Sequence, residues 1–367
     1  MNSTSIRRVA GPSLAVLALG LAVSACGAGN EAATTTDSSS TSLSGTLNGA
    51  GSSAQQSAQS AWSAAFGKAN SGVTINYDPS GSGAGVEQFN AGAIDFAGSD
   101  AALDPTKGEV AAANKRCGAD VLEVPDYVSP IAVVFNVKGI TKLNLDAATI
   151  GKIFSGTITK WNDAAIAALN PGATLPSTGI NPIHRSDDSG TTNNFTDYLF
   201  QASGGTWKSE ANKTWPLKSG EGAAGTSGVI SAVKAGDGAI GYADDSQVGT
   251  LDTAAIKVGS AWTAPSADGA AKALLASPLD TTRAAGDMAI KVDRTTTAAG
   301  AYPLMLTSYL IACPTYSADK AKVVKAYLAS IVSTAGQQLA ATSAGAAPLP
   351  ADLQTKAAAI IDGITSK

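Results

Sequence analysis

Short apolar segments that run into a glycine-rich or serine-rich turn, and then into a helical pattern, recur along this chain. SGTLNGAGSS (44–53) predicts a strand and a turn, and small apolar residues then recur at helical spacing through 54–65. VTINY (73–77) alternates as a strand does, and PSGSGAG (79–85) follows it as a second turn. IDFAGSD (94–100) predicts a buried strand that ends in a Ser-Asp turn. This order of strand, turn and helix favours an α/β fold over an all-β fold.

The same alternation continues to the C-terminal part of the chain. Strands are predicted at 131–137, 180–187, 236–244 and 301–312, and helical segments at 152–172 and 318–334. The chain has 367 residues. Because single hydrophobic cores rarely grow past roughly 250–300 residues, this length allows two compact lobes.

The composition is that of a globular protein and argues against a nucleic-acid partner. Hydrophobic residues make up 44% and charged residues 15% of the chain, and the formal net charge is −4. Basic residues are adjacent only at Arg7-Arg8 and Lys115-Arg116. A nucleic-acid-binding surface would need a cluster of basic residues, so we expect no such partner.

The N-terminal segment has the pattern of a bacterial lipoprotein signal. A basic pair is followed by an apolar stretch too short to span a bilayer, and then by the small residues that lead into Cys26. We expect residues 1–25 to be removed, Cys26 to be lipidated, and 26–42 to be a flexible tether. The alternative is an ordinary secretory signal. Residues 1–25 hold two Arg and no acidic residue, so the remaining chain would carry a charge of −6.

The remaining cysteines, Cys117 and Cys313, favour a disulfide over a metal site. An isolated pair in an exported protein is more often a disulfide. The sequence contains no CxxC motif, and its one histidine is His184. A zinc site needs more ligands than this set supplies, so we expect neither a metal nor another cofactor.

Three turns rich in Ser and Gly stand where helices are predicted to begin, namely 51–53, 82–85 and 189–191. The first N–H groups of a helix lack partners and lie at the positive end of its dipole, so they form a ready anion site. Each turn alone would more simply be a helix cap. The three together with Arg185 indicate an anion site.

The chain resembles the phosphate-binding proteins of bacterial ABC-type phosphate uptake systems. The motifs that carry this resemblance are LNGAGSS, DPSGSGAGVEQF, DFAGSDAAL, KIFSGTITKWNDAAIAALNPG, HRSDDSGTT and AYPLMLTSYLI. The resemblance implies a two-lobed, periplasmic-binding-protein-like α/β fold with the ligand cleft between lobes joined by two crossings. The implied crossings lie near 129–132 and 300–303. The implied lobes are 43–130 with 302–367, and 131–301.

The resemblance also implies a set of phosphate-binding residues: Ser53, Ala54 through its backbone N–H, Ser82, Asp100, Arg185, Asp187, Ser189, Gly190 and Thr191. Arg185 would present two donors to phosphate oxygens, and Asp187 would hold its guanidinium in place. Asp100 would accept a proton of phosphate, which sulfate does not carry at neutral pH. Asp188 has no implied role and is expected to be solvated.

The resemblance implies a binding protein rather than an enzyme. It would be an exported monomer, anchored by lipid on the outer face of the cytoplasmic membrane, that delivers phosphate to ABC-type permease subunits. Three alternatives remain open at this point: the same fold with sulfate, molybdate or a phosphonate as ligand, a secreted phosphatase or other hydrolase, and a dinucleotide-binding domain. The hydrolase would have to use His184, and the dinucleotide domain rests on GAGSSA (49–54) alone.

Overall fold

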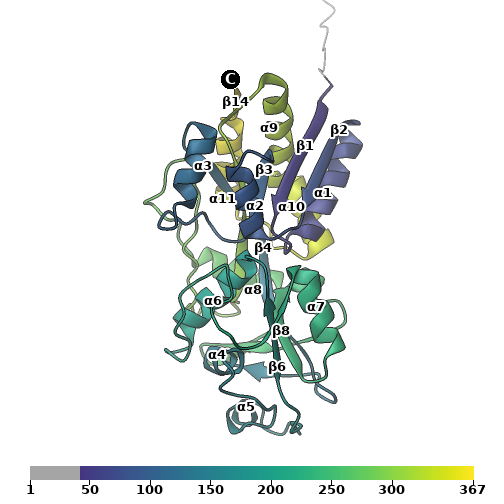
Figure 1. Cartoon of the computed structure of the whole chain (residues 1–367), viewed down its shortest axis with the longest axis vertical. Coiled ribbons are helices and arrows are strands. Elements are labelled where there is room, and N and C mark those ends of the chain that lie inside the picture. Colours follow the sequence, from purple (N-terminus) through teal and green to yellow (C-terminus); the bar gives the residue numbers. More distant parts are fainter. Residues whose placement is uncertain (1–41) are drawn as a thin grey trace, which may run out of the picture. The chain divides into compact units, whose positions relative to one another are not determined.

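One long strand, β4 (Leu122–Asn136), runs through the middle of the main sheet and belongs to both halves of it (Figure 1). The computed structural model describes residues 42–367, so the predicted signal peptide, the predicted lipidation at Cys26 and the predicted tether up to residue 41 lie outside the described residues. The N-terminal part of β4 pairs with β12 (Met305–Ala312), and its C-terminal part pairs with β8 (Ala239–Asp244). The change of partner falls at residues 130 and 131.

The first lobe is built on one end of this sheet. Its strands follow the order β2-β1-β3-β12-β4, in which β1 is parallel to β2 and β3, and β12 is antiparallel to β3 and β4. The further elements of this lobe are β1 (Ser44–Gly51), β2 (Gly72–Asp78), β3 (Phe96–Ser99), β13 (Thr315–Tyr316), β14 (Thr365–Ser366), α1 (Gln56–Ala69), α2 (Ser82–Asn90), α3 (Glu109–Cys117), α9 (Ala318–Val332), α10 (Thr334–Ala344) and α11 (Ala351–Asp362).

The second lobe is built on the other end, in the order β4-β8-β6-β7, with β9 paired to β4 and a small sheet of β11, β10 and β5 beside it. Its elements are β5 (Asn144–Leu145), β6 (Asn181–Arg185), β7 (Glu221–Ala223), β9 (Asp252–Thr253), β10 (Ala255–Val258), β11 (Ala261–Thr263), α4 (Ala147–Phe154), α5 (Ala164–Leu169), α6 (Gly190–Ala202), α7 (Gly225–Ala235) and the 3₁₀ turn Asp245–Gln247. Helix α8 (Ala267–Leu275) packs against β4.

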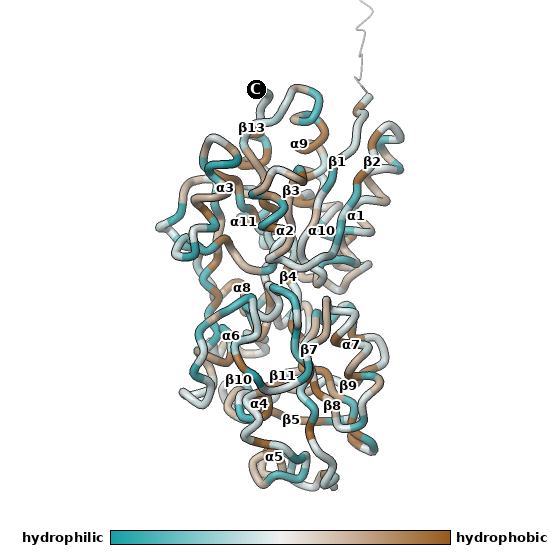
Figure 2. Tube along the Cα trace, in the orientation of Figure 1, coloured by the Kyte–Doolittle hydropathy of each residue, from teal (hydrophilic) through white to brown (hydrophobic). Residues whose placement is uncertain are grey.

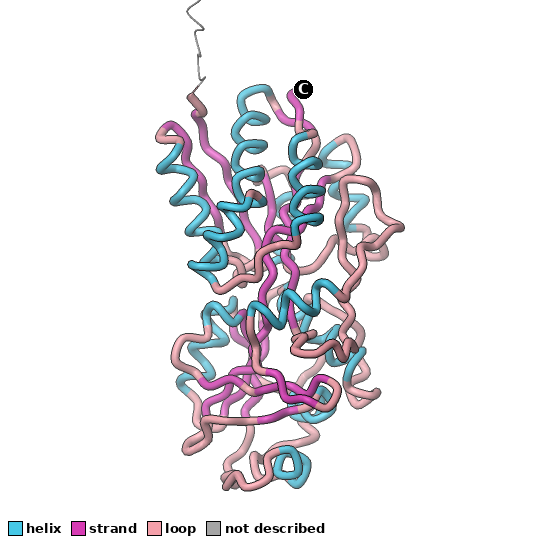
Figure 3. The backbone as a smooth tube through the Cα atoms, turned by 180° about the vertical axis from the view of Figure 1, so that it is seen from behind, coloured by secondary structure: helices cyan, strands magenta, loops and turns pink. Residues whose placement is uncertain are grey.

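Apolar side chains from strands and helices fill the space on both sides of the sheet. Figure 3, seen from behind, shows the strands between flanking helices. Figure 2 shows hydrophobic residues along segments such as α9. In the first lobe Tyr327 contacts the rings of Phe66 and Phe96, with ring centroids 5.2 and 5.6 Å apart. In the second lobe Phe195 stacks on Tyr242 at 4.1 Å. The polar turns between strands and helices are thus left to form the site.

Two sequence predictions of secondary structure are wrong. The strand expected at 131–137 begins earlier, at Leu122. Pro125 and Pro130 lie within β4, and because proline cannot donate a ladder hydrogen bond, they argued against a strand there. The helical segment expected at 152–172 is two helices, α4 and α5. Gly156, with φ of +76°, ends the first, and the side chain of Asp163 caps the second by accepting from Ala165 N at 2.8 Å.

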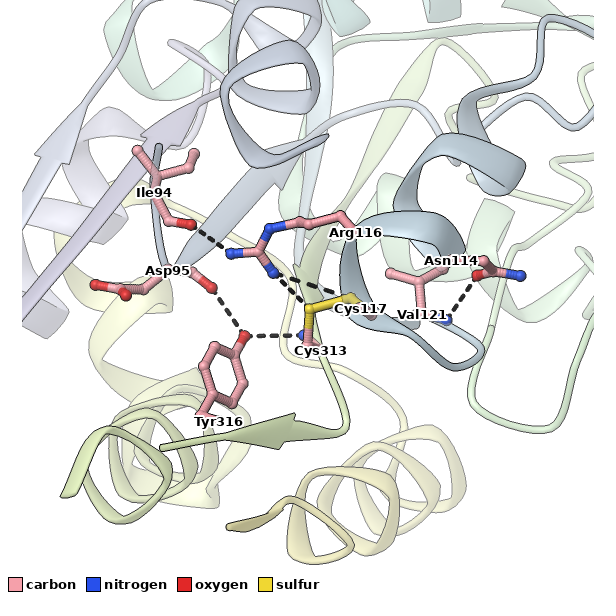
Figure 4. Close-up of a disulfide and its surroundings, with 8 residues drawn as sticks. All are labelled: Ile94, Asp95, Asn114, Arg116, Cys117, Val121, Cys313 and Tyr316. Atoms are coloured by element: carbon pink, nitrogen blue, oxygen red, sulfur yellow. Dashed lines mark hydrogen bonds between the residues drawn. A yellow bond between two sulfur atoms is a disulfide. The ribbon is translucent and has the colours of Figure 1, made fainter. Parts of the chain in front are cut away.

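Cys117 and Cys313 form a disulfide that joins the end of α3 to the residue after β12 (Figure 4). Arg116 lies beside it, with its guanidinium 4.0 Å from the centroid of the Phe89 ring and a hydrogen bond of 2.7 Å to the carbonyl of Ile94. The predicted pairing is confirmed. Both cysteines belong to the first lobe, so the bridge does not tie the two lobes together.

Candidate anion-binding site

The turn after β1 brings Ser53 to the second lobe. Gly51 has φ of +140°, and a Cβ there would lie 2.0 Å from the carbonyl oxygen of Gly98, so only glycine allows β1 and β3 to approach so closely. Ser52 N donates to that same carbonyl at 2.8 Å. The hydroxyl of Ser53 accepts from Thr226 N at 3.1 Å and lies 3.0 Å from Thr226 Oγ1. The first turn therefore meets the N-terminus of α7.

Ala54 is fully buried next to Ser53. Its backbone N–H donates to the hydroxyl of Ser52 at 3.1 Å. The predicted main-chain donor thus has a protein partner in this arrangement. Its phosphate contact stays a prediction.

The turn before α2 lies directly against the segment that follows β6. Gly81 has φ of +100°, and a Cβ there would lie 2.5 Å from a carboxylate oxygen of Asp187. Gly83 N donates to the carbonyl of Asp188 at 2.9 Å. The two lobes therefore touch through main-chain atoms, which is possible only because these positions carry no side chain.

Ser82, Asp100 and Gly190 form one close group across the lobes. Asp100 N donates to the hydroxyl of Ser82 at 3.2 Å. A Cβ on Gly190 would lie 2.6 Å from that hydroxyl oxygen and 2.7 Å from Cβ of Asp100. The N-terminus of α6 therefore sits against the end of β3.

The carboxylate of Asp100 is 2% exposed and is held by two hydroxyl donors. Ser308 donates to Oδ1 at 2.6 Å and Thr191 donates to Oδ2 at 3.2 Å. Burial raises the pKa of Asp100, and the hydrogen bonds from the hydroxyls and the charge of Arg185 offset only part of this effect. The protonation of the buried Asp100 carboxyl group therefore depends on the balance between its burial and the donors around it.

Arg185 is held in place by Asp187. Arg185 is 2% exposed, and its Nε donates to Asp187 Oδ1 at 2.7 Å, with a second contact between the terminal nitrogen and Oδ2. Gly225 N also donates to Asp187 Oδ1, at 2.9 Å. Partial burial alone would raise the pKa of Asp187, but the hydrogen bonds and charge of Arg185 outweigh burial and lower it. Asp187 therefore stays ionised and fixes the plane of the guanidinium.

Ser189, Gly190 and Thr191 form the beginning of α6. The hydroxyl of Ser189 accepts from Thr192 N at 3.1 Å, and Ser189 N donates to the carbonyl of Lys213 at 2.9 Å. These bonds cap the helix and fix its entry angle. The remaining N–H groups of the first turn lie at the positive end of a 13-residue helix.

The predicted residues thus come together at the junction of the lobes. Contacts link Ser53 to α7, Arg185 to Asp187, and Ser82 to Asp100 and the start of α6. Asp188 is exposed, and its carboxylate accepts from Thr214 Oγ1 at 2.5 Å. Its side chain is exposed, as predicted, while its carbonyl contacts Gly83 of the first lobe.

Sequence reasoning missed three contributors. Gly225 and Thr226 begin α7 and contact Asp187 and Ser53. The stretch AAGTSGV (223–229) repeats the glycine-and-hydroxyl pattern of the other three turns and could have revealed them. Ser308 was also missed, although a hydroxyl inside the apolar strand β12 is itself a signal.

The ring of His184 is held in place by stacking and by a contact with the main chain. Its ring stacks on Trp215 with centroids 4.7 Å apart, and its Nδ1 lies 2.8 Å from the carbonyl oxygen of Arg185. Partial burial lowers the pKa of His184. Within residues 42–367, no group of three or more His, Cys, Asp or Glu side chains is placed to hold a metal ion, and no helix has the length and apolar character needed to cross a bilayer.

Comparisons with known proteins define the class. The family model of the PBP superfamily domain matches residues 35–334. Among solved structures, a high-affinity periplasmic phosphate-binding protein called PfluDING superposes with a TM-score of 0.70 at 20% identity, covering 86% of this chain and 93% of its own. The phosphate-binding protein of Stenotrophomonas maltophilia gives 0.65 at 19% identity, covering 86% and 94%. These likenesses confirm the predicted two-lobed fold.

Sequence relatives narrow the family. Phosphate-binding protein PstS 3 of Mycobacterium leprae is 37% identical over 363 residues, which is 94% of this chain and 96% of that protein. PstS2 of Mycobacterium bovis is 36% identical over 374 residues, or 97% and 98%. The chain belongs to the PstS family of phosphate-binding proteins, and the resemblance drawn from its motifs is confirmed.

Proposed function

We propose that the protein captures inorganic phosphate between its two lobes and delivers it to an ABC-type phosphate importer. Membership of the PstS family supports this. The observation that carries it is the Arg185–Asp187 pair, which lies where the turns of both lobes meet.

The donors available to an oxyanion are mostly neutral. A guanidinium has five N–H groups, and Arg185 uses two of them on Asp187, which leaves three for a ligand. The N-termini of α2, α6 and α7 point their dipoles toward the same junction. Because each charge-assisted hydrogen bond contributes roughly 1.5–3 kcal/mol, several of them together hold a dianion beside one cation.

Asp100 supplies the selectivity in this proposal. Ionised, it accepts the proton that phosphate carries at neutral pH. Sulfate carries no proton at neutral pH, so its oxygen and the Asp100 carboxylate would both be acceptors and would repel each other. A site built around such a hydrogen bond rejects an analogue that lacks the proton by about 10⁴–10⁵.

Capture proceeds by closure of the two lobes about the crossings at 129–132 and 300–303. One lobe consists of 43–130 and 302–367, and the other of 131–301. A ligand that contacts both lobes favours the state in which they meet. The nine ligand residues are Ser53, Ala54, Ser82, Asp100, Arg185, Asp187, Ser189, Gly190 and Thr191, and Gly225 and Thr226 support them.

The protein works outside the cytoplasmic membrane as a lipid-anchored monomer. A lipid on Cys26 and the tether at 26–42 would keep it near the permease subunits that accept phosphate. It has no catalytic role, and the packed His184 supports this.

Calorimetry on extensively dialysed protein tests the proposal, with phosphate, sulfate, molybdate and a phosphonate as separate titrants. Tight binding of phosphate with the other anions weaker by at least about a thousandfold is expected. Tighter binding of another oxyanion would replace the assigned ligand, and release of nitrophenol from its phosphate ester would revive a hydrolase.

A further inference from the structure

Arg294 is almost fully buried, at 2% exposed, although it belongs to no predicted part of the site. Its Nε donates to Asp197 Oδ2 at 2.8 Å. One terminal nitrogen donates to the carbonyls of Pro303, at 2.9 Å, and Met305, at 2.6 Å. Pro303 and Met305 lie where the chain enters β12, beside the predicted second crossing. Arg294 therefore ties that entry to helix α6, which carries Asp197.

The other terminal nitrogen of Arg294 donates to the side-chain oxygen of Asn194, which is 5% exposed. The amide nitrogen of Asn194 donates to the carbonyl of Gly190 at 2.9 Å and to the carbonyl of Asp100 at 2.6 Å. Gly190 begins α6 in the second lobe, and Asp100 follows β3 in the first lobe. One amide group therefore joins the main chains of two proposed phosphate ligands.

We propose that Asn194, oriented by Arg294, is a positioning residue for phosphate capture that links the entry to β12 with both halves of the site. This inference rests on the proposed function. The bond from Asn194 to Asp100 spans the lobes, so it exists only while they meet. It adds to the stability of the closed state without touching the ligand.

The charge of Arg294 explains why an amide serves here. A guanidinium donating to the amide oxygen polarises the group and strengthens the N–H bonds that it donates in turn. Asp197 balances the buried charge, with its carboxylate 2.8 Å from Nε. The amide orientation is fixed as well, because only the oxygen can accept from Arg294 and only the nitrogen can donate to two carbonyls.

Asn194→Asp isolates the donor role. The new carboxylate still accepts from Arg294, so the helix keeps its anchor, but it opposes the carbonyls of Asp100 and Gly190 with an acceptor. The matched control is Asn193→Asp, which places the same charge one residue away on α6. The side chain of Asn193 makes no hydrogen bond within residues 42–367, so this variant measures the effect of charge alone.

Titration with inorganic phosphate, by calorimetry and by stopped-flow, is done on the wild type and both variants. We expect Asn194→Asp to bind phosphate at least about tenfold more weakly than Asn193→Asp, mostly through faster dissociation. Small-angle scattering should show that compaction of Asn194→Asp needs correspondingly more phosphate, a readout that a purely structural role would not move. Arg294→Lys, which keeps the charge but not the fork, should fall between the two.

Equal dissociation rates and equal compaction for the two Asp variants would overturn the inference while leaving the proposed function in place. Failure of the wild type itself to bind phosphate would overturn both. Denaturant unfolding of each variant without phosphate separates a general loss of stability from a loss of closure.

Discussion

Lys213 Nζ lies 2.7 Å from Oε1 and 2.8 Å from Oε2 of Glu109, and this ion pair joins the second lobe to α3 of the first. The two side chains are only 10% and 20% exposed. The carbonyl of Lys213 also accepts from Ser189 N, so the same residue holds the start of α6. The pair is therefore a latch across the lobes at the edge of the proposed site.

Lys213→Met should weaken phosphate binding by about 5–30-fold, because the closed state loses one partly buried ion pair worth about 1–2 kcal/mol. The loss should appear as faster dissociation in stopped-flow measurements. Lys272→Met is the control, since Lys272 and Asp268 form an exposed pair, 43% and 76%, within α8. Affinity of Lys213→Met equal to that of the control would show that the latch contributes nothing.

Asp100→Asn should preserve the fold and lower the preference for phosphate over sulfate by at least about a hundredfold. The amide no longer opposes sulfate with a charge, and it offers a donor instead. Asp188→Asn, at an exposed carboxylate of the neighbouring segment, should leave the preference unchanged. Competition calorimetry with the two anions gives the answer, and unchanged selectivity in Asp100→Asn would remove the role assigned to that residue.

The same selectivity should depend on pH in wild-type protein. Burial raises the pKa of Asp100 above its usual value, so its carboxyl group takes up a proton as the pH falls through that raised value. A protonated Asp100 donates to sulfate instead of repelling it. The phosphate preference should therefore be greatest at neutral pH and decline toward acid, and Asp100→Asn should show a flat profile. An equally steep decline in the variant would point to another group.

Arg185→Ala should weaken phosphate binding by at least about a thousandfold, since it removes the charge and three free N–H donors and leaves Asp187 unpaired. Arg185→Lys should recover part of this loss but not the forked geometry. Arg116→Lys, beside the disulfide, provides the control. Near-native affinity of Arg185→Ala would mean that the ligand binds elsewhere.

Asp244 should make the protein less stable as the pH rises from about 4 to about 7. Burial raises the pKa of Asp244 to about 7, against an ordinary value of about 3.9 for an aspartate, while Tyr127 and Ser246 donate to its Oδ1. Between these values the folded state holds a proton that the unfolded state has released, so the free energy of unfolding falls by up to about 1.4 kcal/mol per pH unit. Asp244→Asn should reduce this slope in urea unfolding, while other buried carboxyl groups with a raised pKa, such as Asp100, still contribute to it. The exposed Glu87→Gln should leave the slope unchanged.

Replacing both Cys117 and Cys313 by Ser should lower the free energy of unfolding by about 2–5 kcal/mol. Phosphate affinity should stay within about twofold, because the bridge lies within one lobe and carries no part of the closure. Mass spectrometry of the exported protein after alkylation should find neither cysteine modified. Two alkylated thiols would refute the bridge in the native protein.

Much of the fold was readable because local patterns and tertiary packing agree. VTINY and IDFAGSD are strands, and the apolar spacing after residue 318 marks α9. The failures have local causes. Pro125 and Pro130 made the first part of β4 unrecognisable as a strand. Gly156 ended a helix that the apolar spacing had predicted to be continuous.

The site was readable where hydroxyls and glycines cluster in one segment, as in HRSDDSGTT. It was not readable where a residue acts through a distant partner. Nothing near Asn194 in the sequence signals that Arg294, a hundred positions further along the chain, donates to its side-chain oxygen and orients it in the site. GAGSSA also matched a dinucleotide pattern, but Gly51 is required there by the approach of Gly98.

Because residue 190 is glycine, the addition of a single methyl group there would be enough to keep the two lobes from closing fully. With a Cβ 2.6 Å from the Ser82 hydroxyl and 2.9 Å from the Asp100 nitrogen, an alanine would act as a wedge at one of the points where the two lobes touch. Such a variant would keep every charge and every polar group yet be unable to shut, which makes it a means to study the open form by itself.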